Sequence, residues 1–137
     1  MTKSFSSHTL AIVGSSLALI AFAVGGSGCK LLEKVAKSQK HAAIAFDEKT
    51  GGWGYSFDQL TEDLAKKAST EKCPHCTVRL TWNQGCGALA QSENKREIMT
   101  TATASTRAGA EGAAKTDCMS KAGGGVCKVL VYACNSK

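Results

Sequence analysis

The chain contains an internal repeat with a period of 45 residues, the difference between positions 118 and 73. A stretch that ends at Cys73 recurs as a stretch that ends at Cys118, with threonine and alanine at the same offsets. The matching pairs are Thr61 and Thr106, Ala65 and Ala110, Ala68 and Ala113, and Cys73 and Cys118. Self-similarity at a fixed period indicates one supersecondary unit used twice, so the repeat predicts a duplicated architecture.

An export signal precedes the repeat. Lys3 is followed by an apolar stretch over residues 10–24 and then by small residues up to Cys29. A membrane-spanning helix needs about 20 apolar residues, so this stretch is too short and is typical of a signal peptide over residues 1–28. Gly-Ser-Gly before Cys29 suits a bacterial lipobox, although the third residue before the cysteine is usually leucine there. We therefore expect Cys29 to be lipidated. The alternative is cleavage after Ala23, at an Ala-Phe-Ala site, which would release a secreted protein.

The cysteine count supports a lipid anchor. The chain has 7 cysteines, and an odd number in an exported protein needs its own explanation. Assigning Cys29 to the anchor leaves an even set of 6 (7 minus 1) in the rest of the chain. Such a set is typical of a small domain held by disulfides in an oxidising compartment. The remaining cysteines are Cys73, Cys76, Cys86, Cys118, Cys127 and Cys134.

The chain stays basic after the leader is removed. Lys3 is the only basic residue lost, so 16 (17 minus 1) lysines and arginines face 11 acids, a net charge of +5. Much of this charge lies in residues 29–40, which we expect to be a lysine-rich tether between lipid and domain. The expected partners are the membrane, through the lipid anchor, and an unidentified protein or cell-wall polymer. Nucleic acid is not expected, because no strand combines basic and aromatic residues in the way RNA-binding strands do.

The first unit of the repeat, residues 41–85, begins the globular domain. Apolar runs and alternating patterns predict strands over 42–47, 53–57 and 77–82. Thr61 is the expected N-cap of a helix whose first turn carries acidic residues. We expect this helix to pack inward through Leu60, Leu64, Ala65 and Ala68.

The second unit, residues 86–137, follows the same order. Strands are expected over 87–91, 97–103 and 128–133, with a helix that begins after Thr106 and ends near Lys121. The sequence thus predicts an α+β fold built from an internally duplicated β-β-α-β unit. We expect a largely antiparallel sheet with the two helices on one face. The domain is small, so disulfides are expected to staple it.

The order of these segments resembles a known family. The segments are 42–45 (Ala-Ala-Ile-Ala), 52–56 (Gly-Trp-Gly-Tyr-Ser), the threonine-to-cysteine stretch 61–73, Cys-x-Val at 76–78, 86–90 (Cys-Gly-Ala-Leu-Ala) and 127–134 (Cys-Lys-Val-Leu-Val-Tyr-Ala-Cys). Together they are similar to domain of unknown function 4189 (DUF4189), over residues 41–134. The resemblance implies an exported bacterial domain. The chain departs from the family pattern at 98–100, where a second Gly-aromatic strand would stand, and at 73–76, where two cysteines lie unusually close.

The repeat narrows the disulfide pairing, which six cysteines alone leave open. In each unit one cysteine ends the helix and another begins the next strand, so these two are expected to form a local bridge. Cys86 and Cys134, which follow equivalent strands, then remain, and they are expected to pair across the pseudo-twofold axis that relates the two units. The expected pairs are Cys73–Cys76, Cys118–Cys127 and Cys86–Cys134.

The stretch Cys73-Pro74-His75-Cys76 raises a redox alternative. It resembles the redox centre of thioredoxin-fold oxidants, in which a lowered thiolate pKa makes the disulfide reactive. In that fold, however, the first cysteine opens a helix, whereas Cys73 is expected to close one. A zinc site from Cys73, His75, Cys76 and Cys86 is a second alternative, and an oxidising compartment opposes it. A structural bridge is the preferred interpretation, with no metal and no cofactor.

Aromatic residues give one candidate binding surface. Trp53, Tyr55 and Trp82 stand in predicted strands and, with Phe57, could form a platform for sugars or bases, although residues of this kind more often pack in a core or hairpin. The chain has no nucleophile elbow, zinc-protease motif or phosphate-binding loop. We therefore expect a non-enzymatic envelope lipoprotein that binds a partner. The alternatives are a thiol–disulfide redox protein and a cell-wall polymer binder.

Overall fold

The computed structural model describes residues 39–137, so the predicted signal peptide, Cys29 and most of the predicted tether lie outside the described part of the chain. Both units show the expected order of strand, strand, helix and strand. The first unit comprises β1 (His41–Phe46), β2 (Trp53–Gln59), α2 (Glu62–Glu71) and β3 (Thr77–Trp82). The second comprises β4 (Cys86–Ser92), β5 (Met99–Ala104), α3 (Arg107–Lys121) and β6 (Cys127–Cys134). The α+β class and the duplicated unit are thereby confirmed.

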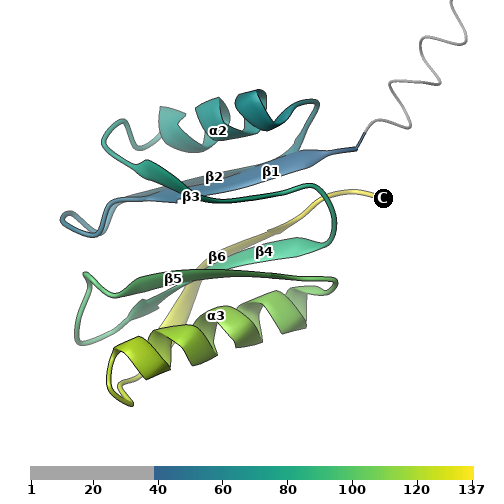
Figure 1. The fold of residues 1–137 in the computed structure, drawn as a ribbon. Helices are drawn as coiled ribbons and strands as arrows, with labels where there is room; N and C mark the ends of the chain where they lie inside the picture. Colours follow the sequence, from purple (N-terminus) through teal and green to yellow (C-terminus); the bar gives the residue numbers. More distant parts are fainter. Residues whose placement is uncertain (1–38) are drawn as a thin grey trace, which may run out of the picture.

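The strands form two separate antiparallel sheets. The strand orders are β2-β1-β3 and β5-β4-β6, so each unit builds its own sheet around its first strand. The sheets stack face to face, with β1 against β4, β2 against β6 and β3 against β5. Each helix covers the outer face of its own sheet, which gives four layers (Figure 1). The expected arrangement, one sheet with both helices on one face, is therefore corrected.

The burial of the two central strands explains this arrangement. Residues 42–46 of β1 and all of β4 are buried, although their side chains alternate between the two faces of a sheet. A central strand buried on both faces needs a cover on each side, and here a helix provides one cover and the other sheet the second. Alanines fill most of the layer between α3 and its sheet, whereas larger side chains such as Ile44, Leu89 and Met99 fill the layer between the sheets.

The helix caps are confirmed in both units. The Thr61 hydroxyl accepts a hydrogen bond from the N–H of Leu64, and Thr106 does the same for Gly109. The inward face of α2 differs from the prediction, because its buried residues are Ala65 and Ser69. Leu60 and Leu64 remain 50% and 46% exposed. Small residues let α2 approach the sheet closely, which leaves the leucines at the margin of the contact.

One buried hydroxyl fixes each helix to its sheet. The Ser56 hydroxyl, on β2, donates to the backbone carbonyl of Ala65 over 2.7 Å. In the second unit the Thr100 hydroxyl, on β5, donates to the carbonyl of Ala114, also over 2.7 Å. These bonds tie a strand side chain to the helix backbone in both halves of the repeat.

The three disulfides join the pairs that the repeat predicts: Cys73–Cys76, Cys118–Cys127 and Cys86–Cys134. The first two link the end of a helix to the following strand within one unit. The third links the start of β4 to the end of β6, because these residues are register partners in the second sheet. Each of the three bridges therefore joins two residues of the same unit, so the expectation that Cys86–Cys134 pairs across the two units is wrong although the pair itself is right. The units are held to each other by the packing of the sheets and by hydrogen bonds.

Candidate functional site

A row of three aromatic side chains lies at the edge of the first sheet. Trp53, Tyr55 and Phe57 occupy alternate positions of β2, and their exposed fractions are 36%, 38% and 47%. Gly54 and Ser56 point the other way, toward α2. Successive ring centroids are 6.1 Å and 6.3 Å apart. We call these three residues the aromatic row. It lies on the side of β2 that faces the second sheet, where β2 is an edge strand and leaves the rings open to solvent.

Trp82 does not belong to this surface. It is 8% exposed and packs between the two sheets. A Cβ atom on Gly87 would stand 2.7 Å from its ring, so a glycine on β4 makes the space for the indole. The predicted surface of Trp53, Tyr55 and Trp82 is therefore corrected: Trp82 belongs to the core, and Phe57 extends the row instead.

The second unit carries no counterpart of the aromatic row. The pairing of β4 with β5 places Met99, Thr101 and Thr103 where the first unit has the three aromatic residues. Met99 is 5% exposed and fills the layer between the sheets. The candidate surface thus lies at the place where the two halves of the repeat differ.

An open cleft of about 440 Å³ adjoins the row. Tyr55 forms one wall and Arg107 and Glu111 of α3 form another, while residues 129–132 of β6 run along the cleft. The Arg107 guanidinium lies 3.5 Å from the ring centroid of Tyr132, in a cation–π contact, and its Nε donates to Glu111 over 2.8 Å. These contacts hold the Arg107 side chain in place beside the strand. We call this hollow the β6 cleft.

A second cleft, of about 630 Å³, lies at the end of the domain where the chain terminates. Polar side chains dominate its lining, together with the Cys86–Cys134 bridge. The amide of Asn135, one of its lining residues, is already hydrogen-bonded to Asp58, Lys40 and Trp82. This cleft therefore offers fewer free recognition groups than its volume suggests.

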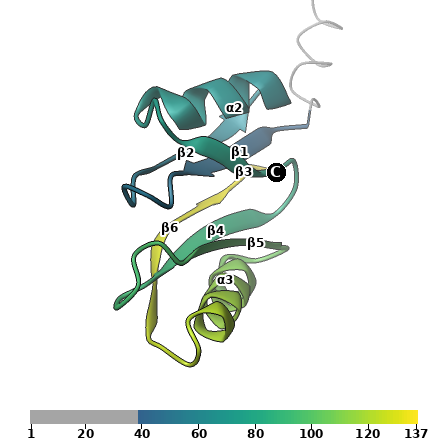
Figure 2. The same ribbon diagram turned by 60° about the vertical axis from the view of Figure 1, so that its left-hand side comes forward.

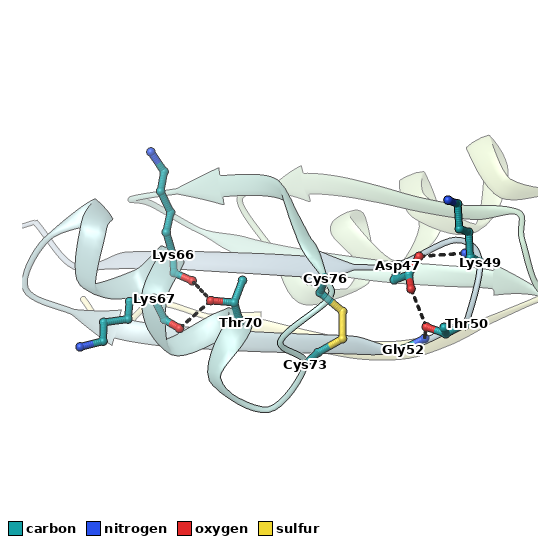
Figure 3. Close-up of a disulfide and its surroundings, with 9 residues drawn as sticks. All are labelled: Asp47, Lys49, Thr50, Gly52, Lys66, Lys67, Thr70, Cys73 and Cys76. Carbon is teal, nitrogen blue, oxygen red and sulfur yellow. Dashed lines mark hydrogen bonds between the residues drawn. A yellow bond between two sulfur atoms is a disulfide. The ribbon is translucent and has the colours of Figure 1, made fainter.

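The Cys73–Cys76 bridge lies at the C-terminal end of α2, beside the turn between β1 and β2 (Figure 3). A Cβ atom on Gly52 would stand 3.1 Å from the sulfur of Cys73, so the turn backbone packs against the bridge. The C-terminal end of a helix carries partial negative charge, which disfavours a thiolate. Reactive thiolates of disulfide oxidants are favoured instead by a helix N-terminus. The position of this bridge thus weighs against redox catalysis.

The zinc ligands considered from the sequence are not brought together. Cys86 is bonded to Cys134 in the second sheet, while Cys73 and Cys76 are bonded to each other and His75 is exposed beside them. Within residues 39–137 no group of three or more histidine, cysteine or acidic side chains is placed to hold a metal ion. In the same range no helix is long and apolar enough to cross a membrane.

Two carboxyl groups, those of Asp47 and Glu62, have pKa values that differ from their ordinary ones. The pKa of Asp47 is lowered by hydrogen bonds from the Thr50 hydroxyl and the Lys49 N–H in the turn after β1 (Figure 3). The pKa of Glu62 is lowered by the hydrogen bond and charge of Lys66, one turn further along α2. Asp47 is half-buried and Glu62 is exposed, and the partners of both groups are local, within the turn after β1 and within α2.

The fold and the surface describe a small, disulfide-bonded α+β domain with a duplicated unit. Residues 41–134 match the family model described as "Domain of unknown function (DUF4189)", and the chain belongs to this family. No curated protein matches the chain. A solved structure, the NMR structure of Rv1813c from Mycobacterium tuberculosis, is similar with a TM-score of 0.52 and 23% sequence identity. The match covers 95% of this chain and 99% of that one, and it supports the fold alone.

Proposed function

We propose that this protein is an exported envelope lipoprotein, anchored through Cys29, whose domain binds a partner without catalysing a reaction. The observation that carries the proposal is the aromatic row, in which three neighbouring rings remain 36% to 47% exposed. Apolar side chains grouped on a surface mark interaction sites, and tryptophan and tyrosine are enriched among the few residues that carry most of the binding energy at such sites. The three disulfides suit a protein that works in an oxidising compartment.

The row is also held rigidly, which favours binding. Gly54 and Ser56, between the aromatic residues, fix β2 against α2 through a close backbone approach and a buried hydrogen bond. Aromatic side chains on a fixed strand lose little conformational entropy when a partner covers them, because the backbone is already ordered. The row therefore has the preorganisation expected of a recognition surface.

Affinity capture from the native envelope tests this proposal. The full-length protein, expressed with its signal sequence, is compared with Tyr55→Ala and with Leu64→Ala. Leu64 is 46% exposed on α2 and serves as the matched control for the loss of an exposed apolar side chain. We expect a partner that Leu64→Ala retains and Tyr55→Ala loses. Equal recovery with both variants, each shown to be folded, would contradict a role for the aromatic row.

Binding of a cell-wall polymer is a second candidate for the same surface. The rings of Tyr55 and Phe57 are nearly parallel, with an interplanar angle of 10°, and consecutive rings of this kind suit stacking against consecutive sugars of a glycan chain. Sedimentation with purified peptidoglycan, using Trp53→Ala as the variant, distinguishes the two. If the parent protein sediments with peptidoglycan and Trp53→Ala does not, the row binds a cell-wall polymer. If the parent protein does not sediment, polymer binding is excluded and a protein partner remains the proposal.

A further inference from the structure

The β6 cleft exposes the free edge of a β-strand. In the sheet order β5-β4-β6, strand β6 is hydrogen-bonded to β4 on one side, and within residues 39–137 no strand pairs with its other side. Backbone N–H and C=O groups on such an edge form a template for another extended chain. With 8 residues, β6 is also the longest strand that the structure describes. Figure 2 shows β6 and β2 on the same side of the molecule.

The cleft follows the strand rather than a single side chain. Four consecutive residues, 129–132, line it, so the cleft runs along the free edge of β6, between α3 and the first sheet. Tyr55 stands on the side of the first sheet, and the Arg107–Glu111 ion pair stands on the side of α3. A chain laid along β6 would therefore have one face against the aromatic row and the other against an ion pair.

One feature of this edge hinders pairing, namely the register shift at Leu130, which lies between the partners of Leu89 and Ala90, but the edge has few of the other features that natural proteins use to block pairing. Proline and inward-pointing charges are common blocking features, and the single proline of the chain, Pro74, lies elsewhere. The one charged residue of β6 is Lys128, which is exposed at the start of the strand. By contrast Val129, Leu130 and Val131 are half-buried and offer apolar contact beside the open edge.

We propose that β6 binds an extended segment of a partner protein by strand addition to the second sheet. This deepens the function proposed above and rests on it, because the added strand would lie beneath the aromatic row. Only an extended polypeptide satisfies alternating N–H and C=O groups along an edge, which excludes a glycan from this particular site. The segment carries apolar residues at alternate positions, facing Tyr55 and Leu130, and a carboxylate next to Lys128.

A pool of synthetic nine-residue peptides, with valine or leucine alternating with aspartate or threonine, provides the probe. Amide hydrogen exchange of the mature domain-containing chain is followed by NMR with and without the pool. We expect the β6 amides that do not bond to β4 to slow at least about tenfold when peptide is bound, as amides do when they enter a ladder. Amides of the other edge strands, β2, β3 and β5, should keep their rates. No slowing in β6 at millimolar peptide, or slowing at another edge, overturns strand addition.

Two matched comparisons test the mode of binding. A peptide selected from the pool is prepared in two N-methylated forms. One form lacks the N–H groups of the peptide edge that would pair with β6, and the other lacks those of the opposite edge. Only the second form should keep its affinity. Lys128→Glu should weaken binding of the acidic peptide at least about threefold and favour a lysine-containing version, because opposite charges across a strand pair attract. Lys115→Glu, an exposed charge reversal on α3, should leave the affinity unchanged. Equal tolerance of both methylated forms would rule the proposal out.

Failure of this proposal is distinguishable from failure of the proposed function. If Tyr55→Ala loses the envelope partner while Lys128→Glu and the methylated peptides show no effect, the aromatic row binds its partner without strand addition. If β6 amides are already protected without peptide and sedimentation shows a dimer, β6 pairs with a second copy and the proposal is wrong.

Discussion

The side-chain oxygen of Asn135 accepts a hydrogen bond from the backbone N–H of Asp58 over 3.0 Å, across 77 positions of the sequence. Asp58 is the one non-glycine residue within 39–137 with a positive φ, 55°, and it lies where the pairing of β1 and β2 shifts register. The Asn135 amide nitrogen also donates to the carbonyls of Lys40 and Trp82. One side chain at the end of the second unit thus binds three backbone segments of the first.

This contact predicts a cost for removing the amide. Asn135→Ala should lower the free energy of unfolding by about 2 kcal/mol, because buried or partly buried hydrogen bonds contribute about 1 kcal/mol each and the Asp58 N–H would lose its acceptor. Asn83→Ala is the matched control, since its amide donates to Gln39 in an exposed setting and its loss should cost less than about 0.5 kcal/mol. Urea unfolding measures both. Equal midpoints for the two variants would contradict the role given to Asn135.

The helices, strands and caps of this fold were predictable from the sequence because the same pattern of residues occurs in both units of the repeat. Thr61 and Thr106 cap helices with the same hydrogen bond, so a weak capping signal becomes strong when it recurs. The disulfide pairs follow for the same reason, since symmetry removes most of the alternatives. Features that depend only on residues close together in the sequence, or on the equivalence of the two units, can therefore be predicted from the sequence.

The arrangement between the units was not predictable in this way. Alternation along a strand shows which residues share a face, but not whether a helix or another sheet covers that face. The burial of Trp82 depends on Gly87 of the other unit, and the exposure of Tyr55 depends on the edge position of β2. The Asn135 contact has no local pattern at all. These features arise from contacts between residues far apart in the chain.

Gly54 is expected to be the glycine least tolerant of substitution. A Cβ atom there would stand 2.0 Å from the backbone carbonyl oxygen of Ser69, so Gly54→Ala must push α2 away from its sheet. We expect a loss of about 3 kcal/mol in the free energy of unfolding.

Gly112→Ala is the matched control for this change. No atom lies within 4 Å of its added Cβ, and it is exposed in the middle of α3. Alanine there should stabilise the domain by up to about 1 kcal/mol, through helix propensity. Thermal unfolding followed by circular dichroism compares the two, and a Gly54→Ala variant as stable as the parent would refute the close approach of α2.

Acidic pH should weaken the domain through Glu62 and Asp47. Both carboxyl groups have a pKa lowered in the folded state, from ordinary values of 4.5 and 3.8. Their stabilisation is therefore present above these values and is lost as the pH falls through the lowered folded-state pKa. Glu62→Gln should reduce the urea midpoint at neutral pH and should have no effect once the carboxyl of the parent is protonated. A Glu62→Gln effect that is the same at about pH 7 and about pH 2 would contradict this linkage.

The anchor prediction concerns residues outside the described part of the chain. We expect the mature protein to begin at Cys29 with attached acyl chains, because Cys29 is the one cysteine without a repeat-based partner and follows Gly-Ser-Gly. Mass spectrometry of the mature N-terminus measures this directly, and Cys29→Ser should shift the protein from the membrane fraction to the soluble one. An unmodified N-terminus at Val24 would show cleavage at the Ala-Phe-Ala site instead.

The Cys86–Cys134 bridge should contribute most to stability among the disulfides. It spans 48 positions, whereas Cys73–Cys76 spans 3. In the chain-entropy model, bridges of these lengths contribute about 4 and about 2 kcal/mol, because a longer loop restricts the unfolded chain more. Cys86→Ser should therefore lower the Tm about 10 °C further than Cys76→Ser. Calorimetry of the two variants tests the order. Peptide mapping under non-reducing conditions that linked Cys86 to Cys73 or Cys76 would overturn the pairing itself.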